Sequence, residues 1–254
     1  MTYEQIKNHP EVTALLERGD YNLGVLGFTD HSMAHCTLVA ERAAYILRKL
    51  GYSDREQELA RIAGCMHDIG NAVNRTHHAE IGALLANDIL KELDMPIADR
   101  MVVISAIGNH DESTGGAKDP VSAALVLADK TDVRRNRVRP QDISQFDIHD
   151  RVNYAVTGST LKVDPQERKI ALNLQVDEGI CTMYDYFDIF LGRMMTKIPQ
   201  PRPDRRQWYG QKRQRRSDSA WRARNEQCDY SRSLWDRSNF PKTRCRQYYC
   251  CRCG

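Results

Sequence analysis

Apolar residues spaced three and four apart run through the chain from about residue 30 to residue 156, and this helical period constrains the fold most strongly. In FTDHSMAHCTLVAERAAYILRKLG, Asp30 is suited to cap the start of a helix and Gly51 to end it. The next segment opens at Ser53, which makes an S-x-x-E capping-box pattern with Glu56. The sequence predicts helices over about 30–51, 53–68, 78–93, 98–109, 120–137 and 147–156.

The period changes to strand-like alternation after about residue 160. Residues 161–164 and 169–177 alternate apolar and polar side chains around the turn PQER, which predicts a β-hairpin. The following ICTMYDYFDIFLGRMM returns to helical spacing. Because an isolated two-stranded hairpin is marginally stable, the hairpin should pack on this helix or pair with another strand. We therefore expect a mainly α protein, with a helical core over 1–158, an appended β-hairpin and helix over 159–198, and a tail over 199–254.

The tail differs sharply in composition from the rest of the chain. From residue 201 onward it carries a net charge of +10, which leaves −7 for residues 1–200 because the whole chain carries +3. Leu234 is its only Ile, Val or Leu, so it lacks the residues of an ordinary core. We predict a disordered, non-native end, such as an out-of-frame extension. The alternative is a nucleic-acid patch in RRQWYGQKRQRR with a metal site in the cysteines, but these lack paired C-x-x-C spacing.

Neither a membrane span nor a secretion signal is evident. No apolar run approaches the roughly 20 residues of a transmembrane helix, and the start MTYEQIKNHPEV has no basic segment followed by an apolar one. We expect a cytoplasmic protein with no membrane association and with reduced cysteines. Cys36 and Cys65 lie in apolar stretches and are predicted to be small core residues rather than nucleophiles.

Residues that can bind metal ions recur at the ends or inner faces of the predicted helices. In chain order they are His31 or His35, the pair His67-Asp68, His77 or His78, His110, and Asp129. A single buried His is usually a hydrogen-bonded core residue, and a single Asp near a helix end is usually a cap. In a bundle, however, side chains from facing helices converge, and a metal would offset the cost of burying Asp129 after ALVLA. Such imidazole and carboxylate ligands suit Mn, Fe, Co, Ni or Zn.

Five segments together resemble the HD-domain metal-dependent phosphohydrolases, and in particular small bacterial HD proteins, over about residues 31–195. They are HCTLVAERA, CMHDIGN, HAEIGALLA, AIGNHDE and LADKTDVRR. The resemblance implies one or two divalent ions, Mn, Fe, Mg, Co, Ni or Zn, and a defined ligand set. One ion would be bound by His35, His67, Asp68 and Asp129, and a second by His78 and His110, with Asp68 as the bridge. Asn71 stands where many family members have Lys.

The resemblance further implies a hydrolase in which a metal-activated hydroxide attacks a phosphomonoester, phosphodiester or phosphoanhydride of a nucleotide-like small molecule. Asp68, His67 and Lys130 are expected to take part in catalysis. The expected phosphate-binding residues are Arg75, Lys130, Arg134 and Arg135, with Lys130 and Arg134 four apart on one face of the predicted helix. The alternative for RRNRVR is a solvated basic helix end, and we interpret a second HD dipeptide at residues 149–150 as coincidence.

A different class of function stays open, a non-catalytic nucleotide-binding regulatory HD module. The full set of ligand types favours an enzyme. The acidic body with a local basic rim favours a phosphorylated small molecule over long nucleic acid, which binds broad positive faces. An exposed hairpin edge could pair with a second copy of the chain and give a homodimer.

Overall fold

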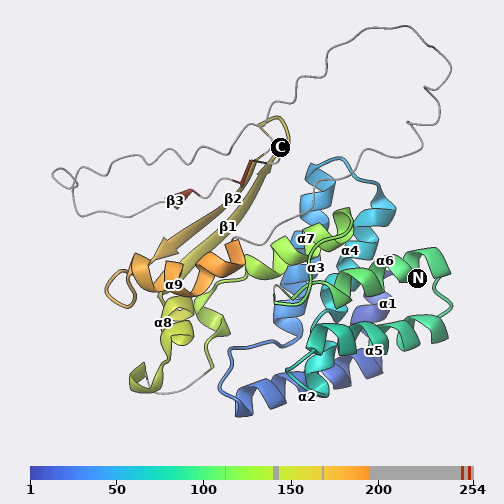
Figure 1. Ribbon diagram of the computed structural model, residues 1–254, viewed down its shortest axis with the longest axis horizontal. Coiled ribbons are helices and arrows are strands. Elements are labelled where there is room, and N and C mark those ends of the chain that lie inside the picture. The colour runs from blue at the N-terminus through green and yellow to red at the C-terminus, as the bar shows by residue number, and fades with distance from the viewer. Residues whose placement is uncertain (112, 140–142, 168, 195–246, 249–250, 253–254) are drawn as a thin grey trace, which may run out of the picture. The chain divides into compact units, whose positions relative to one another are not determined.

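The computed structural model describes residues 1–111, 113–139, 143–167, 169–194, 247–248 and 251–252 (Figure 1). Its helices are α1 (Tyr3–Lys7), α2 (Pro10–Val25), α3 (Met33–Lys49), α4 (Asp54–Met66), α5 (His78–Glu92), α6 (Ile97–Gly108), α7 (Pro120–Lys130), α8 (Ile148–Ala155) and α9 (Met183–Met194), with short 3-10 helices η1 (Ile69–Ala72), η2 (Arg135–Arg137) and η3 (Ile143–Gln145). The strands are β1 (Val156–Asp164), β2 (Lys169–Val176), β3 (Gln247–Tyr248) and β4 (Cys251–Arg252). The mainly α architecture predicted from the sequence is confirmed.

Local capping explains several of the helix starts. Ser53 accepts a hydrogen bond from the backbone N–H of Glu56, whose side chain accepts one in return from Ser53, so the predicted capping box forms. Asp119 caps α7 in the same way, with Pro120 at the first helical position. Two helices, α1 and α2, precede the predicted ones, and α2 begins at Pro10.

The fifth helix is shorter than predicted. The sequence suggested helical spacing over 120–137, but α7 ends at Lys130. The Thr131 hydroxyl donates a 2.7 Å hydrogen bond to the carbonyl of Ala128, and such side-chain bonding to the preceding turn competes with continuation of the helix. Arg134 is extended, so the prediction that Lys130 and Arg134 share one helical face is wrong.

The predicted hairpin forms and is longer than expected on its first strand. β1 pairs antiparallel with β2, Leu161 opposite Leu172, with an irregularity between Val156 and Gly158. β3 and β4 pair antiparallel with β2. The rest of the 199–254 tail, and with it the prediction of a disordered, non-native end, lies outside the described residues.

Two apolar clusters hold these elements together. The larger lies among α1 to α7 and includes Cys36 and Cys65, as predicted for small core residues. The smaller contains Leu172 and Leu174 of the hairpin together with Tyr186 and Phe190 of α9, so the helix and the hairpin share one apolar cluster. Across the described chain, no helix combines the length and apolar character that a bilayer crossing requires.

Candidate metal centre

The predicted ligands gather at helix ends in the larger cluster. They are His35 in the first turn of α3, His67 and Asp68 directly after α4, His78 at the start of α5, His110 just beyond α6, and Asp129 next to the end of α7. All are buried except Asp129, whose side chain is 15% exposed. α3 packs against α4 and α7, and α5 against α6, so helices distant in sequence lie side by side here (Figure 1).

Two glycines permit the close approach of the helices that carry these ligands. A Cβ added at Gly64 of α4 would lie 2.6 Å from the Cα of Ala40 in α3. A Cβ added at Gly70, two residues after Asp68, would lie only 2.0 Å from the carbonyl oxygen of His78. Only glycine leaves room at such backbone contacts. The distances between the ligands therefore depend on residues that cannot bind metal themselves.

The first ligand group comprises His35, His67 and Asp129. The Nε2 atoms of the two imidazoles lie 3.3 Å apart. Asp129 Oδ1 lies 3.4 Å from His35 Nε2 and 3.8 Å from His67 Nε2. All three ligand atoms lie within 4.8 Å of one another, which is close enough to share one ion.

The second ligand group comprises Asp68, His78 and His110. The Nε2 atoms of His78 and His110 are 3.2 Å apart, and Asp68 Oδ1 lies 3.8 Å from His78 Nε2. The other oxygen of Asp68, Oδ2, faces the first group at 3.2 Å from His67 Nε2 and 3.6 Å from His35 Nε2. Asp68 therefore presents one oxygen to each group, as a bridging carboxylate would.

The hydrogen bonds of the imidazoles fit a bound cation. Each of the four ligand imidazoles directs Nδ1 at an oxygen: His35 at Asp132, His67 at Gly64, His78 at Arg75 and His110 at Ile107. Since carbonyl and carboxylate oxygens only accept hydrogen bonds, Nδ1 carries the proton and Nε2 presents a lone pair. The groups thus bring four lone pairs and two carboxylates together, and a divalent cation satisfies such a set of acceptors.

The electrostatics of the cluster lead to the same conclusion. Burial alone would lower the pKa of His67, but the adjacent Asp68 carboxylate holds that pKa well above its usual value. Burial would raise the pKa values of Asp68 and Asp129, yet positive charge on His67 and Lys130, respectively, holds both well below the usual range. For His110, burial prevails and lowers the pKa to about 4. In the metal-free protein a proton on His67 supplies part of the positive charge that these carboxylates require, and a bound metal ion would replace that proton and free Nε2 of His67 as a ligand.

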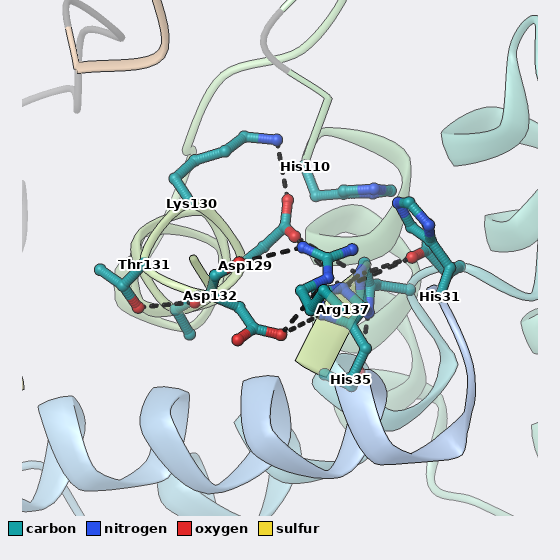
Figure 2. A network of polar contacts seen from close by, with 12 residues as sticks. His31, His35, His110, Asp129, Lys130, Thr131, Asp132 and Arg137 are labelled. Atoms are coloured by element: carbon teal, nitrogen blue, oxygen red, sulfur yellow. Dashed lines mark hydrogen bonds and ion pairs between the residues drawn. The ribbon is translucent and has the colours of Figure 1, made fainter. Parts of the chain in front are cut away.

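Two of the predicted phosphate-binding cations lie beside the ligand groups. Lys130 Nζ lies 2.7 Å from Asp129 Oδ2 and reaches over that carboxylate in Figure 2. Arg75 Nη1 donates a 3.2 Å hydrogen bond to Asn71 Oδ1, and Asn71 Nδ2 donates in turn to Asp68 Oδ1 at 2.9 Å. The guanidinium of Arg75 also lies over the Phe28 ring, 5.3 Å from its centre.

The other two predicted cations bind within the protein. Arg134 pairs with Asp132. Arg135 donates from Nε to the carbonyl of Tyr154 at 2.5 Å and lies over the Tyr154 ring. Their role toward phosphate stays a prediction. His31 belongs to neither ligand group; its Nδ1 faces the carbonyl of Thr29 at 2.7 Å, and its ring contacts His35 edge-on.

Two buried residues at the centre were missed by reasoning from sequence. Asp132 accepts a hydrogen bond from His35 Nδ1 at 2.7 Å, and in Figure 2 its carboxylate points toward His35 and Arg137. Burial opposes its ionisation, but the hydrogen bond from His35 and the pairing with Arg134 hold the pKa of Asp132 below its usual value. In the sequence, only its position three residues after the predicted ligand Asp129 could have pointed to Asp132. Asn71, noted only as a replacement for Lys, is the link between Asp68 and Arg75.

Comparison with known proteins finds a family match for the part of the chain that carries the ligands. A sequence model of the HD domain matches residues 33–150, which contain every ligand of both groups. An uncharacterized protein of Methanocaldococcus jannaschii, MJ1020, is 26% identical over 172 residues, which are 59% of this chain and 66% of that protein. Ribonuclease Y of Campylobacter jejuni subsp. doylei is 30% identical over 146 residues, which are 55% of this chain and 25% of that protein.

Ribonuclease Y of Oceanobacillus iheyensis is 28% identical over 143 residues, which are 54% of this chain and 24% of that protein. The chain therefore spans less than two thirds of each of these curated relatives. No solved structure matches the chain. Residues 33–150 of the chain therefore match the HD domain, the family that the five sequence segments resemble.

Proposed function

We propose that the chain hydrolyses a phosphomonoester, phosphodiester or phosphoanhydride bond of a nucleotide-like small molecule, with the two ligand groups as its metal centre. The observation that carries the proposal is the bridging position of Asp68, with one oxygen toward each pair of imidazoles. Ions bound there would lower the pKa of a water molecule and neutralise charge on the phosphoryl group, the usual chemistry of a two-metal site.

The protein's own side chains have separate roles in this proposal. His67 and Asp68 hold the metal centre, and Lys130 orients Asp129 through the 2.7 Å contact so that the opposite oxygen faces the imidazoles. Lys130 also brings positive charge to the edge of the centre, where negative charge develops on phosphorus. Arg75, held by Asn71, brings a second cation to the other ligand group.

A nucleotide-like substrate is supported by the surroundings of Arg75. Phe28, which lies against the guanidinium, is 41% exposed. An exposed aromatic ring beside an arginine suits a molecule that has both a flat apolar base and a phosphate. Ribonuclease Y, the name of two relatives, makes a phosphodiester in RNA a further substrate to test, although this chain covers only about a quarter of those proteins.

Metal analysis of the purified full chain, followed by a hydrolysis panel, tests the proposal. Chromatography of the products is the readout, because hydrolysis of a phosphodiester gives a phosphomonoester and no free phosphate. The panel contains nucleoside mono-, di- and triphosphates, cyclic nucleotides, a generic phosphoester and a short RNA, each with Mn²⁺, Mg²⁺, Fe²⁺, Co²⁺, Ni²⁺ or Zn²⁺. Asp68→Asn should abolish turnover. Asp99→Asn, which makes the same charge change in a residue paired with Arg55, should not. Turnover that survives Asp68→Asn would refute the proposal.

The same panel distinguishes the proposed hydrolysis from the alternative function, which is nucleotide binding without catalysis. A non-catalytic nucleotide-binding module would bind a nucleotide without turnover under any of these metals. The predicted homodimer through an exposed hairpin edge and the predicted cytoplasmic location stay predictions. Analytical ultracentrifugation of the full chain and fractionation of cells test them.

A further inference from the structure

One of the four ligand imidazoles is held differently from the others. His67, His78 and His110 donate from Nδ1 to main-chain carbonyls at 2.8, 3.1 and 2.7 Å. His35 donates instead to a carboxylate, Asp132 Oδ2, at 2.7 Å. We infer that Asp132 is a positioning residue that fixes the tautomer and ring orientation of His35 and thereby sets the metal affinity of the first ligand group. The inference rests on the metal centre of the proposed function, but not on its substrate.

The carboxylate of Asp132 is itself held in place. Its side chain is fully buried. Arg134 Nη2 donates to Oδ2 at 2.9 Å, and Arg134 Nε donates to Oδ1. Arg137 anchors the backbone at the same point, because its Nη1 donates to the Asp132 carbonyl at 3.0 Å and its Nη2 donates to the Asp30 carbonyl at 2.8 Å. The carboxylate therefore cannot turn away from His35 without breaking the bonds to Arg134.

Both oxygens of Asp132 accept hydrogen bonds from N–H donors, so an amide, which has only one oxygen, cannot replace the carboxylate. In Asp132→Asn, an NH₂ group that faced His35 would force the ring to accept at Nδ1 and to carry its proton on Nε2. That proton would occupy the lone pair needed for the metal. In the other orientation the NH₂ group would face the guanidinium of Arg134, donor against donor. Loss of such an outer partner of a metal-ligating His typically weakens metal affinity about 10- to 100-fold.

The effect should be confined to one ligand group. The contacts of Asp132 within the described residues lead to His35, Arg134 and Arg137, and not to His78 or His110. A purely structural role would behave differently, because loosening of the helical core would weaken both ligand groups together. The comparison of the two groups therefore separates positioning from general destabilisation.

Mn²⁺ titration of the full chain in two backgrounds tests this comparison. His110→Ala removes the second ligand group, so the remaining strong site reports on the first. Adding Asp132→Asn there should raise the Kd for Mn²⁺ about 10- to 100-fold. Adding Asp99→Asn, a charge-matched change at the start of α6, should leave the Kd unchanged. An unchanged Kd with Asp132→Asn in this background overturns the inference.

His35→Ala provides the second background, in which the second ligand group remains. Here Asp132→Asn should change the Kd for Mn²⁺ by less than about twofold, because the residue through which Asp132 acts is gone. An equal loss of affinity in both backgrounds would show a structural role and overturn the inference. Thermal unfolding of each variant establishes that the compared proteins are folded.

A measurement on the unaltered chain keeps the inference testable if the Asp132 variants do not fold. With Zn²⁺ as a diamagnetic probe, the Nδ1 proton of His35 should exchange slowly with solvent in imidazole NMR spectra, because Asp132 accepts it in a buried site. A rapidly exchanging proton overturns the inference. A chain that binds no Mn²⁺ refutes both the inference and the metal centre. The predicted Kd changes without hydrolysis of any substrate in the panel would support the role of Asp132 and refute the proposed function.

Discussion

Gly70→Ala is a sharp test of how the backbone sets the ligand distances. Gly70 lies in η1, directly after the His67-Asp68 pair, and α5 crosses it at His78. An added Cβ would lie 2.0 Å from the carbonyl oxygen of His78 and 2.6 Å from the backbone nitrogen of Gly82. Both neighbours are backbone atoms, so no side-chain rotation can make room. The start of α5 must therefore move.

The size of that movement follows from contact distances. Carbon and carbonyl oxygen atoms approach to about 3.3 Å, so the start of α5 would shift by roughly 1.3 Å from the 2.0 Å contact. Metal sites tolerate ligand displacements of about 0.2 Å. His78 should therefore cease to be a ligand. Overpacking of this kind destabilises a protein by about 1–3 kcal/mol, which corresponds to a fall in Tm of roughly 2–12 °C for a domain of this size.

Thermal unfolding and Mn²⁺ titration of the full chain measure both effects. The second ligand group should lose its Mn²⁺ affinity, while the first group keeps an intact ligand set. Gly116→Ala is the matched control, because a Cβ at Gly116 would meet no atom within 4 Å, and its stability should stay within about 0.5 kcal/mol of the unaltered chain. If Gly70→Ala kept both its Tm and two Mn²⁺ sites, the close approach of η1 and α5 would not control the ligand geometry.

Three further predictions concern the metal, the phosphate contact and pH. Removing the metal with a chelator should lower Tm by roughly 5–11 °C relative to protein with Mn²⁺ at a hundredfold its Kd, since that binding contributes about 2.7 kcal/mol. Differential scanning calorimetry measures this difference in Tm, and an unchanged Tm would count against the proposed metal centre. Arg75→Met should raise KM for the substrate found in the panel roughly tenfold or more, with a smaller change in kcat, because a charged hydrogen bond from arginine to phosphate is worth about 1.5–3 kcal/mol. Steady-state kinetics measure both constants, and a fall in kcat alone would contradict the prediction. In metal-free protein, burial lowers the pKa of His110 to about 4, while the same imidazole in the unfolded chain has a pKa near 6.5. The contribution of neutral His110 to stability is therefore fully present above about pH 6.5 and is lost as pH falls toward 4. Denaturant unfolding of His110→Gln should show a flatter dependence of stability on pH, and an identical slope would argue against a buried neutral imidazole.

Much of the fold follows from local signals in the sequence. The capping box at Ser53, the Pro that opens α7 at residue 120 and the alternation around the hairpin turn all act within a few residues, so they were readable without tertiary information. The ligand types were also readable, because His and Asp at the ends of apolar helices are unusual enough to need an explanation. The order of these residues was sufficient to recognise the HD family.

Distances between segments far apart in the chain were decided only by the tertiary structure. Helical spacing could not show that α7 stops at Lys130, where Thr131 bonds back to Ala128. Nor could it show that the next turn of chain then brings Asp132 to His35, 97 residues earlier. The residue types that can bind a metal are a property of the sequence alone. Which oxygen faces which imidazole depends on how closely helices pack, and that is set by backbone contacts no local pattern records.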